Sequence, residues 1–337
     1  MTAGKLGILG MGYHLPPNEI TDDFLQKDVG LERGSDWVES RLGIHCRYSV
    51  LSRDYIVKTR NKNPLQGMLH ARSHGETPET LGIKAALAAI KDAGIRPGDV
   101  GMVIANSDTA FDLVPSMAIL VAKGVGAGPG PHCDMNSACS SFARHLQAIA
   151  DMRQDRVPEF VLCVQTDAYT VRTDYSPQSI DAYIFGDGAC AQVVSTRHEG
   201  KLTAEPLIFE TRAEAAETII VDMSGHLDQD GKTVREFSVR KTCEMFEHIA
   251  EVKGLYADEA YTVAHQANYV MQTSILQHLE LPEEKHLRNV HLQGNIAAAG
   301  CPSAICQNLE RLHKGDKIAY AVLGAGLAWG GGYMEVN

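Results

Sequence analysis

The sequence predicts an α/β fold in which a parallel or mixed sheet is covered by helices. Patterns typical of buried strands alternate with amphipathic helix patterns along most of the chain, and this order indicates such a fold. The 337 residues exceed one average domain. Elements follow a similar order in both parts of the chain, so we expect two α/β halves, at 1–195 and 196–337, although no sequence repeat connects them.

The first half begins with a short apolar strand near residues 5–10. A helix is expected to start at Thr77, a capping residue followed by Pro78, and to end near Ala93, where Gly94 can stop it. The next elements are a strand at 100–106, a helix at 115–124, a strand at 160–165 and an apolar strand ending at 194. The polar stretch 195–201 is the best boundary between the halves.

The second half continues the alternation. It predicts a helix at 234–253, a strand at 261–264, helices at 268–279 and 302–312, and a strand at 317–323. The segment 50–75 interrupts the alternation of strands and helices, because it is highly charged and shows little periodicity. It reads either as a lid-like surface excursion with a short helix or as a solvated loop without a role.

Composition and charge limit the kinds of partner that the protein is expected to bind. The net charge of 31 minus 42, or −11, argues against nucleic acid or an acidic membrane surface, so an anionic substrate would need a local basic patch. No apolar run approaches the roughly 20 residues of a membrane span, and a cytoplasmic protein is expected. The eight cysteines form no CxxC pair and no zinc-like spacing, so we expect reduced thiols and no metal.

Cys139 is the strongest candidate for a nucleophile. It lies among small residues at the start of an apolar-periodic run, where a helix is expected to begin and its N-terminus would favour a thiolate. Two distant segments carry suitable partners, His265 and Asn295. Each residue alone would more often be structural. Together, a thiolate, an imidazole and a carboxamide can hold and elongate an acyl thioester.

Five motifs in order resemble the signature of β-ketoacyl-acyl-carrier-protein synthase III. They are Cys139 in its small-residue context, the Gly-Asp-Gly-Ala segment 186–189, the His-Gln-Ala-Asn segment 265–268, the Gly-Asn pair 294–295 and the Gly-rich segment 324–330. The resemblance covers nearly the whole chain. It implies a thiolase-type fold, in which two similar α/β halves form a five-layered αβαβα sandwich, and a homodimer.

The resemblance also implies roles for matching positions. Cys139 would accept the acyl group, with its own backbone N–H and that of Ala325 forming the oxyanion hole. His265 and Asn295 would stabilise the enolate formed when a malonyl thioester loses carbon dioxide. Asn cannot act as a base at neutral pH, so it suits a carbanion made by decarboxylation. The expected activity is therefore a decarboxylative Claisen condensation that yields a β-ketoacyl product without a bound cofactor.

Substrate contacts are expected on the same grounds. Trp37, Arg41 and Arg172 match family positions that contact the adenine and phosphates of coenzyme A, although a buried Trp and two surface ion pairs would be the plain reading. Val114 and Phe237 are expected at the acyl pocket. Val114 stands where short-chain relatives carry a bulky Phe that reaches into the partner subunit, so a longer or aromatic acyl group is expected. The donors would be coenzyme A or carrier-protein phosphopantetheine thioesters.

Some positions depart from the family pattern. Family members usually carry a basic residue after the His-Gln-Ala-Asn segment, and it helps to dock the carrier protein. This chain has Tyr-Val-Met at 269–271 instead, so the sequence leaves open whether a carrier protein docks here. With Val114 and the long 50–75 segment, this favours a synthase of secondary metabolism, such as a quinolone or polyketide pathway. Three alternatives stay open: joining two acyl chains without decarboxylation, acyl transfer to an alcohol or amine, and a non-catalytic partner subunit. The relatives that join chains use a Glu base at the Val114 position, and Val cannot replace it.

Overall fold

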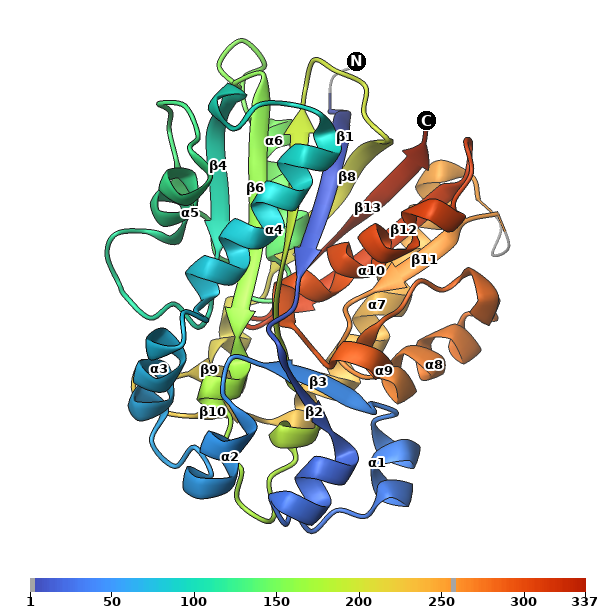
Figure 1. Ribbon diagram of the computed structural model, residues 1–337. Helices are drawn as coiled ribbons and strands as arrows, with labels where there is room; N and C mark the ends of the chain where they lie inside the picture. The colour runs from blue at the N-terminus through green and yellow to red at the C-terminus, as the bar shows by residue number, and fades with distance from the viewer. Residues whose placement is uncertain (1–3, 256–258) are drawn as a thin grey trace.

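The computed structural model describes residues 4–255 and 259–337, and nine strands in these ranges form one mixed sheet (Figure 1). In sheet order the strands are β11 (Tyr261–Ala264), β12 (Lys317–Gly324), β13 (Ala328–Val336), β8 (Leu202–Thr211), β1 (Leu6–His14), β7 (Asp187–Ser195), β6 (Phe160–Ala168), β4 (Val100–Asn106) and β5 (Cys133–Asp134). β11 and β12 are parallel, as are β4 and its two neighbours, and the remaining pairs are antiparallel. The short pairing of β1 with β8, from Leu6 to Ile8, joins the two parts of the sheet.

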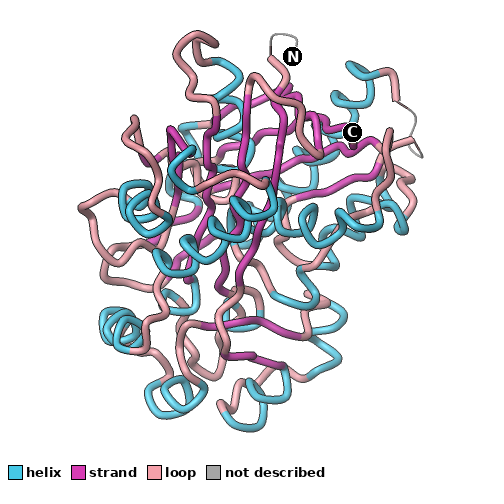
Figure 2. Tube along the Cα trace, turned by 45° about the horizontal axis from the view of Figure 1, so that its top comes forward, coloured by secondary structure: helices cyan, strands magenta, loops and turns pink. Residues whose placement is uncertain are grey.

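Helices cover the sheet on its outer faces and fill the space between its two parts (Figure 2). α4 (Pro78–Ala93) packs on β1, β6 and β7, and α5 (Met117–Val125) packs on β4. α6 (Ser141–Asp151) and α10 (Gly300–Asn308) contact strands of both parts. α7 (Gly231–Lys253) packs on β12 and β13 and against α8 (Tyr269–His278). The order is therefore helix, sheet, helix, sheet, helix, as expected.

The helix ends follow local capping chemistry. Thr77 accepts a hydrogen bond from the backbone of Thr80, Pro78 takes the first position of α4, and Gly94 ends the helix with a left-handed φ of 68°. This confirms the expected boundaries of α4. α7 begins three residues earlier than the expected helix, because the Asp230 side chain caps it by accepting from the backbone of Thr233.

A smaller layer lies at the lower end of the sheet in Figure 1. Its elements are α1 (Ser35–Arg41), α2 (Arg53–Thr59), α3 (Pro64–Ser73), α9 (Val290–Gln293), the strand pair β2 (Asn18–Thr21) and β3 (Cys46–Ser49), and the hairpin β9 (Ile219–Val221) and β10 (Leu227–Gln229). The short strands gave no sequence signal, because three or four residues carry too little periodicity.

The segment 50–75 is two short helices, α2 and α3, instead of an excursion with one short helix. Between them the buried Asn61 donates its side-chain amide to the carbonyl oxygens of Thr170, Val171 and Thr173. The reading as a solvated loop is wrong, because this buried side chain ties the segment to the chain that follows β6.

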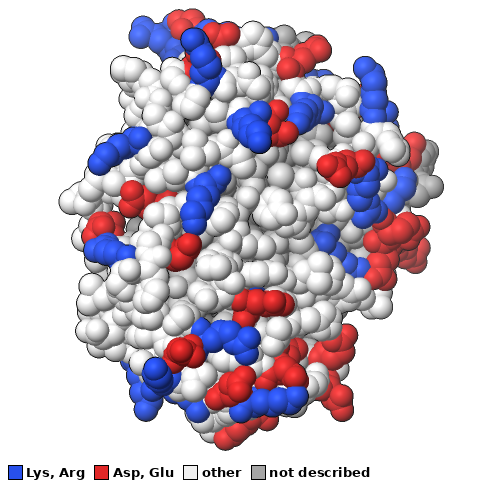
Figure 3. All heavy atoms as spheres, viewed as in Figure 1, with Lys and Arg blue, Asp and Glu red and all other residues white. Residues whose placement is uncertain are grey.

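The predicted division between residues 195 and 196 falls in the link between β7 and β8 and stays a prediction. No helix within the described ranges is long and apolar enough to cross a membrane. Lys and Arg side chains are interspersed with Asp and Glu on the face drawn in Figure 3, with wide neutral areas between them. Charged side chains of the described residues form ion pairs, such as Arg72 with Asp112 at 2.7 Å.

Candidate active site

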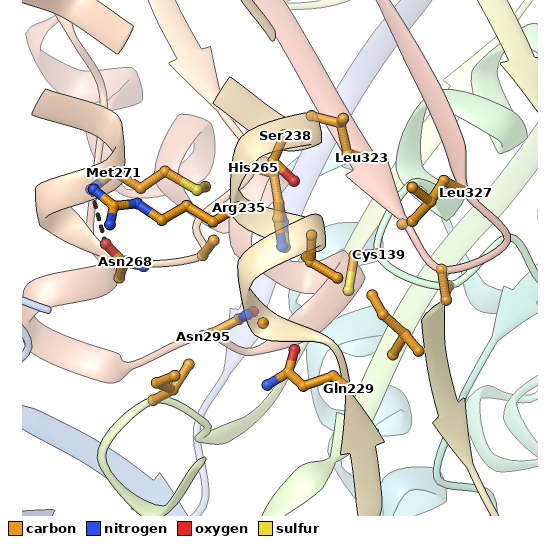
Figure 4. A pocket seen from close by; sticks show the side chains of 18 of the residues that line it. Cys139, Gln229, Arg235, Ser238, His265, Asn268, Met271, Asn295, Leu323 and Leu327 are labelled. Carbon is orange, nitrogen blue, oxygen red and sulfur yellow. Dashed lines mark hydrogen bonds between the residues drawn. The ribbon is translucent and has the colours of Figure 1, made fainter. Parts of the chain in front are cut away.

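The three predicted catalytic residues, Cys139, His265 and Asn295, line one cavity of about 140 Å³ (Figure 4). They come from distant parts of the chain: Cys139 precedes α6, His265 follows β11, and Asn295 follows α9. Two other predicted site residues, Ala325 and Phe237, line the same cavity. The fold therefore brings together five of the nine side chains selected from the sequence, and the role of each stays a prediction.

A tight turn presents Cys139 to the cavity. α6 begins at Ser141 with Ser140 as its N-cap, so Cys139 lies one residue before the cap. Ala138 has a φ of 47°, which is uncommon for a residue other than glycine. The turn is held by the Ser140 hydroxyl donating to the Ser137 carbonyl at 2.6 Å and by the Ser141 hydroxyl donating to that of Ala138 at 2.7 Å.

The surroundings of Cys139 favour the thiol over the thiolate. Burial raises the pKa of Cys139 well above its ordinary value, and the carboxyl groups of Asp108 and Asp167 raise it further. Its own backbone N–H acts in the opposite direction. The helix start, which was expected to favour the thiolate, is therefore outweighed at Cys139 by desolvation and by the two acidic neighbours.

A glycine lets the Ala325 loop approach the Cys139 turn. A Cβ atom on Gly324 would lie 2.9 Å from the Cys139 nitrogen and 2.6 Å from the Ser137 oxygen, closer than such contacts allow. Only glycine therefore fits at 324 without displacing one of the two loops. Ala325 follows directly and faces the same cavity, as an oxyanion hole shared with Cys139 would need.

His265 is held by its backbone and remains uncharged. Its N–H donates to the Ala321 carbonyl at 2.9 Å, and its carbonyl accepts from the Gln272 side chain at 3.2 Å. Burial lowers the pKa of His265 to about 4, so the imidazole is neutral at pH 7. Its Nδ1 atom is buried and has no hydrogen-bond partner within the described ranges. A neutral imidazole can donate one hydrogen bond to a substrate oxygen.

Asn295 is oriented by both its backbone and its side chain. Its N–H donates to the Ile184 carbonyl at 2.8 Å, and its carbonyl accepts from Gly186 at 3.0 Å. The side-chain oxygen accepts from the Ala297 N–H at 2.9 Å. Because the amide oxygen is engaged, the amino group is the end left to donate to a ligand.

The remaining wall of the cavity is mainly apolar. Tyr169 stacks on Phe185 with ring centroids 4.9 Å apart, and Phe237 packs against Trp329 at 5.6 Å. Leu227 of β10 adds an aliphatic side chain. No sequence pattern predicted this wall, because the strands of the β9–β10 hairpin are too short to show one. A buried apolar wall suits an acyl chain.

Arg235 also lines the cavity, although it was not among the residues predicted from the sequence. It is the one Lys or Arg among the described residues that line the cavity, and no Asp or Glu lies among them. Figure 4 shows its side chain beside Asn268 and Met271. A usable signal existed, since Gly231, Arg235 and Ser238 are spaced four and three apart and share one helix face.

Four predicted contact residues lie outside this lining. Trp37 and Arg41 are on α1, where the Arg33 guanidinium lies 5.0 Å from the Trp37 ring centroid. Arg172 donates to the Met223 carbonyl at 2.8 Å, so it braces the turn of the β9–β10 hairpin. Val114 is 80% exposed in the loop between β4 and α5. Their predicted roles stay predictions.

The cavity lies in a chain that matches known proteins over most of its length. Residues 133–209 match the family model 3-oxoacyl-[acyl-carrier-protein (ACP)] synthase III, and residues 253–336 match the model of its C-terminal part. The β-ketoacyl-[acyl-carrier-protein] synthase III of Bacillus pumilus is 30% identical over 329 residues, which are 96% of this chain and 96% of that protein.

Solved structures agree on the fold. The 3-oxoacyl-(acyl carrier protein) synthase III of Pseudomonas aeruginosa has a TM-score of 0.83 at 23% identity, covering 98% of both chains. The priming β-ketosynthase of a polyketide biosynthetic pathway has a TM-score of 0.82 at 22% identity, covering 98% of this chain and 96% of that one. These similarities confirm the expected thiolase-type fold.

The fold and the sequence matches together define a thiolase-superfamily condensing enzyme, which is an acyltransferase. Within that class, the chain belongs to the β-ketoacyl-[acyl-carrier-protein] synthase III family. The resemblance inferred from the five motifs is confirmed, and so is the condensing activity in general terms.

Proposed function

We propose that Cys139 accepts an acyl group from a thioester and that the enzyme condenses it with a malonyl thioester, releasing carbon dioxide and a β-ketoacyl product. The observation that carries the proposal is the meeting of Cys139, His265 and Asn295 in one cavity. A sulfur nucleophile and two neutral donors are the groups that such a condensation requires.

In the first step the Cys139 sulfur attacks the thioester carbonyl and the donor thiol leaves. The turn at Ala138 holds the thiol at the cavity surface, and the loop at Ala325 lies against that turn. Backbone N–H groups of Cys139 and Ala325 would stabilise the oxygen of the tetrahedral intermediate. Donors of this kind are worth roughly 3 to 4 kcal/mol each.

In the second step a malonyl thioester loses carbon dioxide, and its carbanion attacks the acyl group on Cys139. The negative charge of the enolate falls on the thioester oxygen. The neutral imidazole of His265 and the free amino group of Asn295 are suited to donate to that oxygen. The Asn295 amide cannot act as a base at neutral pH, and the lowered pKa of His265 makes its imidazole a weak base, which favours decarboxylation over proton abstraction as the source of the carbanion.

The cavity size suggests the class of acyl primer. Its volume of about 140 Å³ resembles that of an engineered apolar cavity of roughly 150 Å³ that binds benzene. A short to medium or aromatic acyl group would fit, with Phe237 in its wall. Val114 could bear on primer choice only through a second subunit, since it is 80% exposed on its own chain. We therefore keep the homodimer as part of the proposal.

The proposal extends to the acyl donor and to the biosynthetic pathway. Arg235 at the cavity provides one cation for an anionic thioester, whether coenzyme A or a carrier protein. The basic residue of housekeeping relatives is replaced by Val270 or its neighbours, and this departure supports a role in secondary metabolism over the start of fatty-acid synthesis.

Product analysis tests the proposal. The enzyme is incubated with acyl-coenzyme A thioesters and a ¹³C-labelled malonyl thioester, and carbon dioxide and product are followed by mass spectrometry. Release of one labelled carbon dioxide per β-ketoacyl product supports the proposal. A product that keeps both carboxyl-derived carbons, or an ester or amide product, would identify one of the other reactions instead.

A further inference from the structure

Arg47 is a fully buried arginine on β3, outside the lining of the catalytic cavity. β3 packs beside α9, the helix that precedes Asn295 in the chain (Figure 1). Arginine is almost never fully buried unless its charge is paired. Here the Nη1 atom donates to the Asp22 carboxylate, which is the ion-pair partner of Arg47. The charge is thus satisfied, and the other N–H groups of the guanidinium contact the main chain.

The guanidinium binds two main-chain carbonyl groups. Its Nε atom donates to the Tyr183 oxygen at 2.9 Å, and Nη2 donates to the same oxygen and, at 2.9 Å, to the Ile44 oxygen. Tyr183 directly precedes Ile184, whose carbonyl oxygen accepts the Asn295 N–H at 2.8 Å. The carbonyl group that Arg47 holds and the one that holds Asn295 therefore belong to adjacent residues.

The aliphatic stem of Arg47 packs against the backbone on both sides of the same contact. A Cβ atom on Gly294, which has a φ of 71°, would lie only 2.8 Å from Arg47 Cγ. A Cβ atom on Gly186 would lie 3.4 Å from Arg47 Cβ. Gly294 directly precedes Asn295, and the Gly186 N–H donates to the Asn295 carbonyl at 3.0 Å. Arg47 thus supports both backbone segments that hold Asn295.

The other two members of the predicted catalytic set are held without Arg47. Serine hydroxyls of its own turn hold Cys139, and the backbone of β12 and a glutamine side chain hold the backbone of His265. None of these bonds involves Arg47. A change at this arginine is therefore expected to move Asn295 and to leave the nucleophile in place.

We propose that Arg47 is a positioning residue that acts through Asn295. Its guanidinium fixes the segment at Tyr183, and its stem supports Gly294, so that the Asn295 amino group is held where the enolate oxygen forms. The inference rests on the role proposed for Asn295 in malonyl decarboxylation. Displacing a donor by about 1 Å can lower a rate by about 10²-fold, so support from outside the cavity bears on turnover.

Arg47→Met tests the proposal, because methionine keeps an unbranched stem and removes the guanidinium. Cys139 acylation is measured by intact-protein mass spectrometry, and decarboxylation is measured as carbon dioxide released from a malonyl thioester. Decarboxylation should fall by about 10- to 100-fold, while acylation should change by less than about twofold. A variant that is merely less folded would lose both steps in the same proportion, and that result would overturn the proposal.

A double-mutant cycle shows whether Arg47 acts through Asn295. If it does, Arg47→Met should lower decarboxylation by less than about twofold further in a protein that already carries Asn295→Ala, because the donor that it positions is gone. Losses that multiply in the double variant would show that Arg47 acts independently of Asn295 and would overturn the proposal.

Two further variants complete the test. Arg197→Met is the control, because Arg197 also donates to a main-chain carbonyl, that of Val157 at 2.8 Å, but lies outside the cavity lining. Both half-reactions should stay within about twofold of the wild type. If Arg47→Met does not fold by thermal melting, Arg47→Lys carries the same cycle, since lysine keeps the stem and the charge but lacks the planar fork that binds Tyr183.

Crystal structures of the wild type and the Arg47 variant report the position of Asn295 without reference to activity. Asn295 should be displaced while Cys139 and His265 superpose, and an undisplaced Asn295 would contradict the proposal. Failure of the proposed function is distinguishable from this result. If Asn295→Ala decarboxylates like the wild type, the role of Asn295 is lost, whereas the structures still decide whether Arg47 positions it.

Discussion

Gly186 donates its backbone N–H to the carbonyl oxygen of Asn295 at 3.0 Å, and this bond ties the loop before β7 to the loop that carries the donor amide. A second bond between the same two loops, from the Asn295 N–H to the Ile184 carbonyl oxygen, is 2.8 Å long. The Gly-Asp-Gly segment therefore has a positional role: it holds the backbone from which the Asn295 side chain reaches the cavity.

Gly186→Ala should displace Asn295. The added Cβ would lie 2.5 Å from the Gln293 carbonyl oxygen, and overpacking of this kind typically costs about 1 to 3 kcal/mol of unfolding free energy. We expect a lower melting temperature and a loss of condensation that exceeds any loss of Cys139 acylation. Gly98→Ala is the control, because its Cβ would meet no atom within 4 Å. Equal activity of the two variants would contradict the positional role.

His265→Ala and Asn295→Ala should separate the two half-reactions. Each removes one donor to the enolate oxygen, and loss of such a donor typically lowers turnover by about 10² to 10³. Malonyl decarboxylation should fall by this amount while Cys139 still becomes acylated. Asn268→Ala is a useful comparison, since the Asn268 oxygen caps α8 through the Met271 N–H and its loss should mainly reduce stability. A variant of His265 that loses acylation but keeps decarboxylation would reverse the assignment.

The charge state of His265 gives a pH prediction. Its pKa is lowered from 6.5 to about 4, so the ring should stay neutral through pH 6 and decarboxylation should show no inflection near 6.5 from this residue. As the pH falls, the unfolded chain binds the His265 proton near pH 6.5, whereas the folded chain binds it only near pH 4. The contribution of neutral His265 to the free energy of unfolding is therefore lost as the pH falls from 6.5 through 4. Ring proton signals in an NMR titration check this. A midpoint near 6.5 would contradict a desolvated imidazole.

Arg235→Gln should weaken binding of anionic thioesters. Arg235 is the one cation among the described lining residues, and it lies beside Asn268 and Met271 in Figure 4. We expect KM for a coenzyme A thioester to rise about tenfold, equivalent to about 1.4 kcal/mol, with kcat changed less than about twofold. Arg240→Gln serves as the control, because Arg240 pairs with Glu244 at 2.7 Å outside this lining. Similar KM changes in both variants would indicate a general charge effect.

Long elements with clear caps could be predicted from the sequence. The helix from Pro78 to Ala93 and the strands beginning at Val100 and Tyr261 lie where their patterns indicated, because periodicity and capping residues agree along them. The hairpin β9–β10 could not be predicted, since strands of three residues depend on tertiary contacts such as the Arg172 bond to Met223.

The residues of the site also fall into those that the sequence predicts and those that it does not. Cys139, His265 and Asn295 each lie in a distinctive local motif, so their meeting in one cavity could be predicted. Arg235 and Tyr169 have no such motif, and their positions depend on how α7 and the chain after β6 pack around the cavity. The raised pKa of Cys139 could not be predicted either, because it depends first on burial and then on carboxyl groups that only the fold brings near.

The central claim is that Cys139 carries the acyl group, and intact-protein mass spectrometry tests it most directly. The wild type and Cys133→Ala, which alters another partly exposed cysteine, are incubated with acyl-coenzyme A thioesters beside Cys139→Ala. We predict one acyl mass on the first two proteins, none on Cys139→Ala, and loss of the acyl mass with release of carbon dioxide when a malonyl thioester is added. An acyl mass that persists on Cys139→Ala would contradict the account.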